Sequence, residues 1–280
     1  MHDVISVKHD RTLGLAPIFR PLGRGERSES KLDVSVSGDN EQMRITCFEP
    51  LGTDDQILYF TIISLCTNED RGRILSVEPQ TESGKILRND LFVRKSSQSD
   101  SIMIEASEYE LLKLCDKTDG GLNYEGLREM LARLASVNLR IKNRFEDYVV
   151  RLLAYHVDKE TGKVRIAVNT KSANAILGSQ YVYINLADHL KLNYEPAQIL
   201  HGWLSSWMPQ GTTRRIGILK LVLHVYPTYE QVSDISRRNY RSRTKKAALL
   251  LNDLGWKVTA TGRGNDLMFT VSRPKIKALP

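Results

Sequence analysis

The segment 233–254 constrains the fold of this chain more than any other part of the sequence. Six of the ten residues 237–246 are Arg or Lys, and no Asp or Glu occurs between Ser236 and Asn252. At about 100° per residue the segment forms an amphipathic helix. Its apolar side consists of Tyr240, Ala247, Leu250, Leu251 and Leu254. The opposite side carries Arg238, Arg241 and Lys245, with Ser242 and Asn252 beside them.

The residues that flank this helix predict its two ends and the neighbouring elements. Ser233 or Asp234 is a suitable N-cap, and Gly255 lies where a glycine commonly ends a helix. The segments 256–260 and 267–271 alternate around a Gly-rich turn at 262–265, which predicts a β-hairpin. A short apolar helix is expected upstream at 216–225, closed by Pro227.

This order of helix, turn, basic helix and hairpin is typical of a winged helix-turn-helix. In that arrangement the second helix enters the major groove of DNA and the hairpin contacts the backbone. The alternative is a helix whose charges only keep it in water. A solvated face usually interleaves acids with bases, whereas like charges three and four residues apart repel one another. A polyanion such as DNA would neutralise them.

The distribution of charge along the chain favours the DNA-binding alternative. From Met208 to the end the sequence has 14 Lys and Arg against 4 Asp and Glu, a net charge of +10. Since the whole chain has a net charge of +7, the first 207 residues have a net charge of −3. The positive charge is therefore concentrated around the basic helix, as in a nucleic-acid-binding surface.

Composition and cysteine usage limit the class of protein. The 280 residues suffice for one large or two ordinary domains. No run of about 20 apolar residues is present that would span a membrane, and the N-terminus lacks the pattern of a secretory signal. Cys47, Cys66 and Cys115 are odd in number and lack ligand-like spacing, so we expect buried thiols in a reducing cytoplasm.

The N-terminal part of the chain is expected to begin with a basic arm. Residues 1–31 combine Arg and Lys with Gly and Pro and show no apolar period, which predicts an extended arm that either lies on DNA or is an ordinary flexible terminus. Strands are predicted at 32–36 and 43–47, and the polar stretch 78–100 is expected to be a long loop or a short excursion. Asp54 and Asp55 begin an apolar helix at 56–66, where they act as caps; a metal site there lacks a partner cluster.

A second helix-turn-helix pattern occupies the middle of the chain. A strand at 102–104 precedes two helices, which begin after Ser107 and at Asn123, and strands come next at 137–142, 148–157 and 164–168. The second of these helices mixes Arg and Glu, so it is a weaker candidate for DNA binding than the tip of the hairpin after it.

We therefore predict an α+β protein with two tandem winged-helix domains. The predicted units are a basic arm at 1–31, an N-terminal domain at 32–169, and a C-terminal domain at 170–280 that is the main DNA reader.

The sequence lacks the patterns of the common catalytic and cofactor sites. It has no Gly-x4-Gly-Lys-Ser/Thr loop for nucleotide phosphates, and its six histidines never occur as His-x-His or His-Glu-x-x-His. Tyr229 and Tyr240 are conceivable nucleophiles for DNA strand transfer, but neither has a neighbouring base or metal cluster in the sequence. We expect no cofactor, no metal and no enzymatic activity.

Several stretches together resemble the RepC initiator proteins of IncQ-type plasmids, which belong to the tandem winged-helix plasmid initiators. The resemblance extends over nearly the whole length, with departures at 92–100 and 229–231. It is carried by the segments 24–34, 49–55, 78–84, 200–201 and 254–259, by the basic helix, and by 272–275. It implies a cytoplasmic bacterial protein that binds directly repeated origin sequences (iterons), promotes opening of the duplex and recruits a plasmid helicase and primase. It also implies a non-enzymatic protein that forms a homodimer off DNA through its first domain.

The predicted DNA contacts fall into three groups. Base edges are expected to be read by Arg238, Arg241, Ser242 and Lys245. Phosphates are expected to be contacted by Arg237, Arg243 and Lys246 on the helix and by Lys257 and Arg263 on the hairpin. The N-terminal domain is expected to contribute Asn123, Arg128, Arg140, Lys142, Asn143 and Arg144. A winged-helix transcriptional regulator and a rolling-circle nicking enzyme are the two alternative functions.

Overall fold

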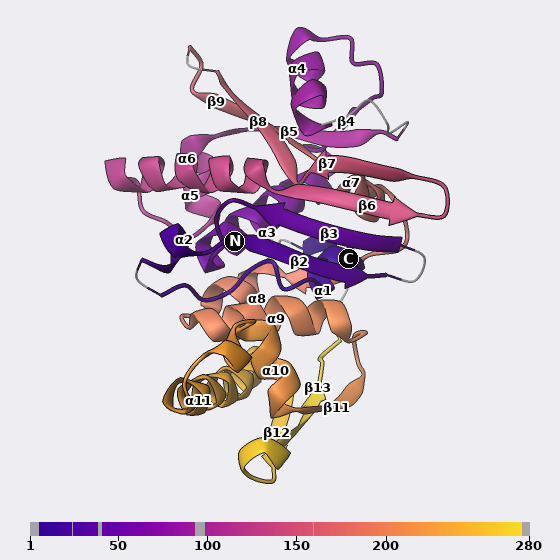
Figure 1. The fold of residues 1–280 in the computed structure, drawn as a ribbon. Coiled ribbons are helices and arrows are strands. Elements are labelled where there is room, and N and C mark those ends of the chain that lie inside the picture. Colours follow the sequence, from indigo (N-terminus) through magenta and orange to yellow (C-terminus); the bar gives the residue numbers. More distant parts are fainter. Residues whose placement is uncertain (1–5, 24, 39–40, 93–98, 159, 276–280) are drawn as a thin grey trace.

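The computed structural model describes residues 6–23, 25–38, 41–92, 99–158 and 160–275. These residues form a mixed α/β fold with small antiparallel sheets, shown in Figure 1. The mixed class agrees with the sequence prediction. No helix in the described ranges is both long enough and apolar enough to cross a membrane, and all three cysteines are buried free thiols.

The first part of the chain builds two four-stranded sheets around a buried helix, α3 (Thr53–Thr67). One sheet has the order β2-β3-β6-β7, with the strands Leu32–Ser37, Glu41–Cys47, Asn138–Asn143 and Asp147–Arg151. The other has the order β4-β5-β9-β8, with the strands Arg73–Leu75, Ser101–Ser107, Lys163–Val168 and Leu153–Asp158. Their helices are α4 (Glu82–Leu91), α5 (Glu108–Leu114) and α6 (Gly121–Ser136).

Helix α3 is at the centre of the core because it is apolar on nearly every side. Leu58, Tyr59, Ile62 and Ile63 are completely buried, and the helix contacts α6 on one side and α8 and α9 on the other. A helix that is hydrophobic all round is stable in water only when other elements cover every face. Both halves of the molecule therefore pack on this one element (Figure 1).

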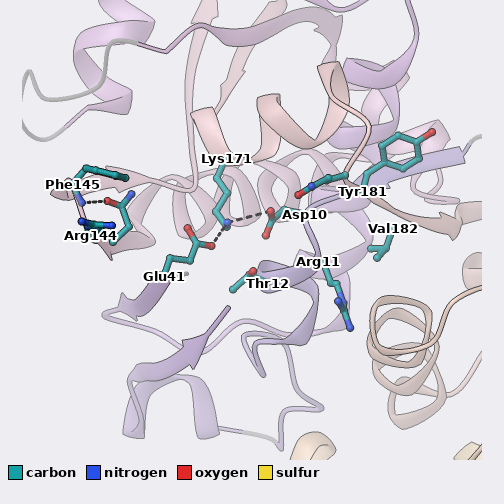
Figure 2. A pocket seen from close by; sticks show the side chains of 11 residues that line it. Asp10, Arg11, Thr12, Glu41, Arg144, Phe145, Lys171, Tyr181 and Val182 are labelled. Atoms are coloured by element: carbon teal, nitrogen blue, oxygen red, sulfur yellow. Dashed lines mark hydrogen bonds and ion pairs between the residues drawn. The ribbon is translucent and has the colours of Figure 1, made fainter. Parts of the chain in front are cut away.

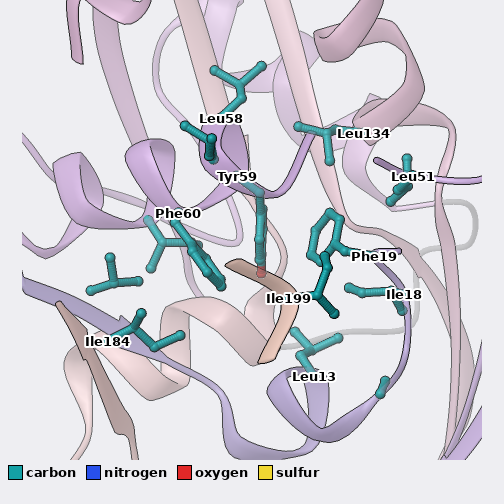
Figure 3. Close-up of a cluster of buried hydrophobic side chains, with 14 of the residues drawn as sticks. Leu13, Ile18, Phe19, Leu51, Leu58, Tyr59, Phe60, Leu134, Ile184 and Ile199 are labelled. Carbon is teal, nitrogen blue, oxygen red and sulfur yellow. The ribbon is translucent and has the colours of Figure 1, made fainter. Parts of the chain in front are cut away.

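The N-terminal segment is part of the core, so the prediction of an extended arm is wrong for residues 6–22. The segment forms β1 (Ser6–His9) and α1 (Arg11–Leu15), and Glu26–Glu29 forms the short helix α2. Strand β1 pairs antiparallel with β10 (Val182–Asn185). Leu13, Ile18 and Phe19 lie beside Tyr59 and Phe60 of α3, as Figure 3 shows. Their spacing gave no period because Leu13 lies on the short helix α1, whereas Ile18 and Phe19 lie in the irregular chain after it.

The second part of the chain forms a helical layer and a three-stranded sheet. The sheet has the order β11-β13-β12, with the strands Thr213–Gly217, Met268–Ser272 and Lys257–Thr261. The helices are α7 (Thr170–Leu177), α8 (Leu186–Lys191), α9 (Glu195–Trp207), α10 (Ile218–Val225) and α11 (Asp234–Leu250), with 3-10 turns η1 (Tyr229–Gln231), η2 (Leu251–Leu254) and η3 (Gly264–Asp266). The predicted basic helix and the hairpin after it are confirmed as structural elements.

Two further local predictions are wrong. The expected loop at 78–100 contains α4, which Thr81 caps by accepting a hydrogen bond from the Gly84 amide. Leu87 and Leu91 are the buried apolar side chains of this short helix. Two positions are too few to show the apolar period of a helix in the sequence. The expected single strand at 148–157 is broken at Leu152, which leaves the β6–β7 pairing and leads into the other sheet. The Leu152 amide donates to the Val137 carbonyl at the break.

Candidate nucleic-acid interface

Helix α11 is attached to the protein along its apolar side. Ala247 and Leu251 are completely buried, and the Tyr240 ring stacks on Tyr226 with 4.0 Å between ring centroids and 3° between ring planes. The Ser233 hydroxyl caps the helix by accepting from the Ser236 amide at 3.3 Å. Gly255 ends the helical region with a φ of 80°, which favours glycine. The basic side consequently points away from the core.

The central cations of α11 are free of the protein's own carboxylates. Arg238 and Lys245 are exposed, and neither side chain forms a hydrogen bond or ion pair within the described ranges. The exposed Ser242 hydroxyl beside them has no hydrogen bond there either. The ion pair of this helix in those ranges joins Arg237 to Asp234 at 3.4 Å. Unpaired like charges on one helix face are unfavourable in the isolated protein, and they form a surface complementary to a polyanion.

The cations at the edges of this face contact neighbouring parts of the protein. Arg237 donates to the Tyr229 and Glu230 carbonyls at 3.3 and 2.7 Å, which ties the start of α11 to the preceding turn. The Arg243 guanidinium lies 5.6 Å from the Tyr226 ring centroid, and the Lys246 ammonium lies 4.9 Å from that of Tyr194. These contacts hold the charges in place while leaving them ionised.

The pKa of Arg243 reflects this environment. Burial disfavours its charged form, but the Tyr194 hydroxyl, Tyr226 and Glu195 favour it, and together they raise the pKa of Arg243. Arg243 is therefore charged at any physiological pH.

The β12–β13 hairpin after α11 adds two exposed cations and a contact to the helix. Lys257 on β12 and Arg263 at the hairpin turn are exposed, and their side chains have no hydrogen-bond or ion-pair partner among the residues that the structure describes. Arg241 donates a hydrogen bond from Nη1 to the Asn265 side-chain oxygen at the tip of the hairpin. The structure thus brings the predicted C-terminal contacts together on α11 and the hairpin after it.

The predicted contacts of the N-terminal unit are mostly committed to internal partners. Asn123 donates to the Thr118 carbonyl and hydroxyl at 2.8 and 3.0 Å. Arg128 forms a bidentate ion pair with Glu108 at 2.7 and 2.9 Å, and the hydrogen bond to Glu108 raises the pKa of Arg128.

The hairpin of that unit is held in a similar way. Arg140 forms a bidentate pair with Asp147 at 2.9 and 2.7 Å across the β6–β7 strands. The Asn143 side chain accepts from the Phe145 and Glu146 amides at 2.8 Å. Lys142 and Arg144 remain exposed at the tip.

The N-terminal residues do not form one surface. Asn123 and Arg128 lie on the first half of α6, whereas the hairpin tip lies on the other side of the molecule in Figure 1.

An open cavity of about 890 Å³ lies next to this tip, between the hairpin and the N-terminal segment (Figure 2). Lys171 crosses it to reach Asp10, at 3.3 Å, and Glu41. Since the cavity's central ammonium is already paired with two carboxylates, the cavity is not a general anion site.

Sequence reasoning missed three basic residues beside the C-terminal unit. Arg214 lies 4.9 Å and Lys220 5.5 Å from the centroid of the Trp207 ring. Arg215 is exposed on the edge strand β11. The adjacent pair Arg214-Arg215 was the sequence signal that could have identified them. Because successive side chains of a strand point to opposite faces, only Arg215 of this pair is exposed.

The chain matches the sequence model of one protein family and is similar in fold to solved structures of another protein. The sequence model of the family described as Replication protein C (RepC) matches residues 1–275. Two crystal structures of domains 2 and 3 of RctB are similar in fold. A selenomethionine derivative gives a TM-score of 0.54 at 11% identity, with 94% of this chain and 98% of that chain covered. A second RctB structure gives a TM-score of 0.52 at 12% identity, with 93% and 95% covered. Curated protein sequences give no match.

Proposed function

The chain belongs to the Replication protein C family, and on this basis we propose that it initiates replication by binding iterons in the double-stranded DNA of a plasmid origin. The matched region extends over nearly the whole chain, which supports a role in replication initiation. We further propose that the chain contains two tandem winged-helix domains. The order α9, β11, α10, α11, β12, β13 supports this for the C-terminal unit, and α3, β5, α5, α6, β6, β7 for the N-terminal one.

The exposed and unpaired cations of α11 are the observation that carries the proposal. Arg238 and Lys245 form no ion pair with any carboxylate in the described part of the chain, so their full charge is available to the groove. An arginine that reaches the two acceptors of a guanine gives about 1–3 kcal/mol of discrimination. Arg237, Arg243 and Lys246 are held at the edges of the same face, as required of side chains that contact phosphates and fix the register.

In the proposed mechanism the C-terminal unit reads the repeat and the wing secures the flanking backbone through Lys257 and Arg263. The N-terminal unit adds backbone contacts through its hairpin tip. The protein acts by binding and has no catalytic site of its own, so helicase and primase from the plasmid carry out unwinding and priming. In the absence of DNA we propose that it forms a homodimer.

Footprinting of the full-length protein on its plasmid origin, with a salt titration, tests the proposal. A triple variant, Arg238→Ala with Arg241→Ala and Lys245→Ala, is expected to lose the repeated footprint. The matched control removes the same amount of charge elsewhere, on β4, α4 and α8, through Arg73→Ala, Lys85→Ala and Lys191→Ala. We expect the control to retain the footprint, because charge lost far from the reader changes only long-range attraction.

Each alternative function predicts a different result in the same experiment. If the triple variant binds the origin as tightly as the wild type at moderate salt, α11 is not the reader. A footprint confined to one operator, without repeats, favours a transcriptional regulator. A covalent tyrosyl–DNA product would identify a nicking enzyme.

A further inference from the structure

The tip of the β6–β7 hairpin presents an exposed phenylalanine. The Phe145 side chain is 86% exposed, the highest value among the large apolar residues that the structure describes. Figure 2 shows it next to Arg144 at the outer end of the hairpin. Single exposed apolar side chains are common on protein surfaces, so exposure alone assigns no role. The rigidity and the charge of the tip distinguish this residue.

The backbone at the tip is fixed by three hydrogen bonds. The Asn143 side-chain oxygen accepts from the amides of Phe145 and Glu146, both at 2.8 Å. The Asn143 amide donates to the Glu146 carbonyl at 2.9 Å. The Arg140–Asp147 pair joins the two strands just below the tip. Phe145 therefore projects from a preorganised turn, and little conformational entropy remains to be lost when it inserts into a partner.

The charges around Phe145 favour a polyanionic partner. Lys142 and Arg144 are exposed on the tip, and the Arg144 guanidinium lies 5.7 Å from the Phe145 ring centroid. Glu146 is the carboxylate closest in sequence; it is also exposed, and it lines an adjoining cavity that contains Lys171. An exposed apolar ring with two cations on the same turn suits the surface of duplex DNA, where stacked bases lie beside rows of phosphates.

We propose that Phe145 is an apolar wedge that enters the minor groove of origin DNA and unstacks one base step, while Lys142 and Arg144 contact the flanking phosphates. Architectural proteins kink DNA with inserted side chains of this kind, and the unstacking is offset by the additional contacts that the bend permits. This inference rests on the proposed function, and it gives the N-terminal unit the task of distorting the duplex that the C-terminal unit has recognised.

The test uses the full-length protein and origin duplexes that carry 2-aminopurine at successive steps. Wild-type protein is expected to raise the fluorescence severalfold at one step, and Phe145→Ala is expected to abolish the rise and weaken binding about tenfold. The salt dependence should not change, because no charge is removed. Phe145→Leu should retain most of the signal, since leucine also acts as a wedge.

A matched control and a modified duplex separate the wedge from a general loss of apolar surface. Phe48 is another exposed phenylalanine, 59% exposed and located just after β3, and Phe48→Ala should leave the fluorescence rise unchanged. On a duplex with an abasic site at the affected step, the wild type should bind about tenfold more tightly than on intact DNA, because the stack is already open. Phe145→Ala should gain little from that change.

The outcomes distinguish failure of this inference from failure of the proposed function. If the wild type leaves no footprint on the origin, the proposed function is wrong. If the footprint is intact and Phe145→Ala still gives the full fluorescence rise, only the wedge is wrong. The wedge is also wrong if Phe145→Ala weakens binding to single-stranded DNA alone, or if it changes only the association state of the free protein in sedimentation.

Discussion

Replacement of Asp55 is expected to destabilise the protein strongly, because this carboxylate joins three separate segments of the chain. The Asp55 side chain is completely buried at the start of α3. One oxygen accepts from Arg133 Nε on α6 at 3.0 Å. The other accepts from the Gly52 amide at 2.7 Å and from Arg27 Nη1 at 3.2 Å. The side chain thus connects α3, α6 and the N-terminal segment.

The magnitude can be worked out from the groups that Asp55→Ala leaves without a partner. The Arg133 side chain is only 10% exposed and would keep a single distant contact, to Glu129 at 3.6 Å. Removal of one partner from a buried ion pair costs about 3–5 kcal/mol. Arg27 is 35% exposed, so water replaces much of its interaction and it adds little. We expect a loss of about 3 kcal/mol in the free energy of unfolding, which lowers the Tm by about 10 °C.

Urea denaturation and calorimetry of Asp55→Ala measure this loss, and the neighbouring acid supplies the control. Asp54 is 57% exposed and forms one ion pair, with Lys117 at 3.0 Å. Asp54→Ala should cost less than about 1 kcal/mol, as exposed pairs usually do. Equal losses in the two variants, or a loss below about 1 kcal/mol for Asp55→Ala, would refute the assignment of Asp55 as a buried junction.

Three other predictions concern packing, pH and DNA reading. Gly14→Ala should cost about 2 kcal/mol in urea denaturation, because its Cβ would lie 2.1 Å from the Ser206 hydroxyl oxygen; Ser206→Gly should partly restore stability. Burial lowers the pKa to about 3 at His9, His201 and His224. The unfolded chain binds these protons from about pH 6.5 downward and the folded chain does not, so stability is lost as the pH falls. We expect these three sites together to contribute a loss of about 4 kcal/mol between about pH 7.5 and 5.5, measured by urea titration, and the loss to be smaller in His224→Gln. Arg241→Ala should relax specificity at one base position in a binding-site selection, whereas Arg263→Ala should weaken all sequences alike and reduce the salt slope by about one unit.

The C-terminal helix and hairpin were predictable because their signals are local. The apolar period, the Ser233 cap and Gly255 all lie within one short stretch of sequence, and each describes the element that contains it. The N-terminal segment was not predictable in the same way. Leu13 and Phe19 are buried only because α3 and α9 supply a groove for them, and no window of sequence contains that groove.

The candidate site shows the same division between local and long-range information. The residue types on the outer face of α11 can be derived from helix periodicity alone. The partners of those residues cannot, because the Arg241–Asn265 bond joins positions 24 residues apart and the Arg128–Glu108 pair positions 20 apart. Charge counting treats Arg128 and Arg238 as equal, and only the fold shows that one is neutralised internally and the other is not.

Under the proposed function, that difference in pairing predicts an order in which the two units bind DNA. Arg128 and Arg140 must exchange a bidentate carboxylate for a phosphate, so each gains only the difference between two similar interactions. Arg238 and Lys245 pair with no carboxylate in the part of the chain that the structure describes, so in the proposed function they gain the whole interaction with the groove together with the release of bound counterions. In that proposal, attraction and recognition begin at the C-terminal unit. The proposed role of the N-terminal hairpin follows once the duplex is held, when the loss of base stacking at Phe145 can be offset by contacts that both units make.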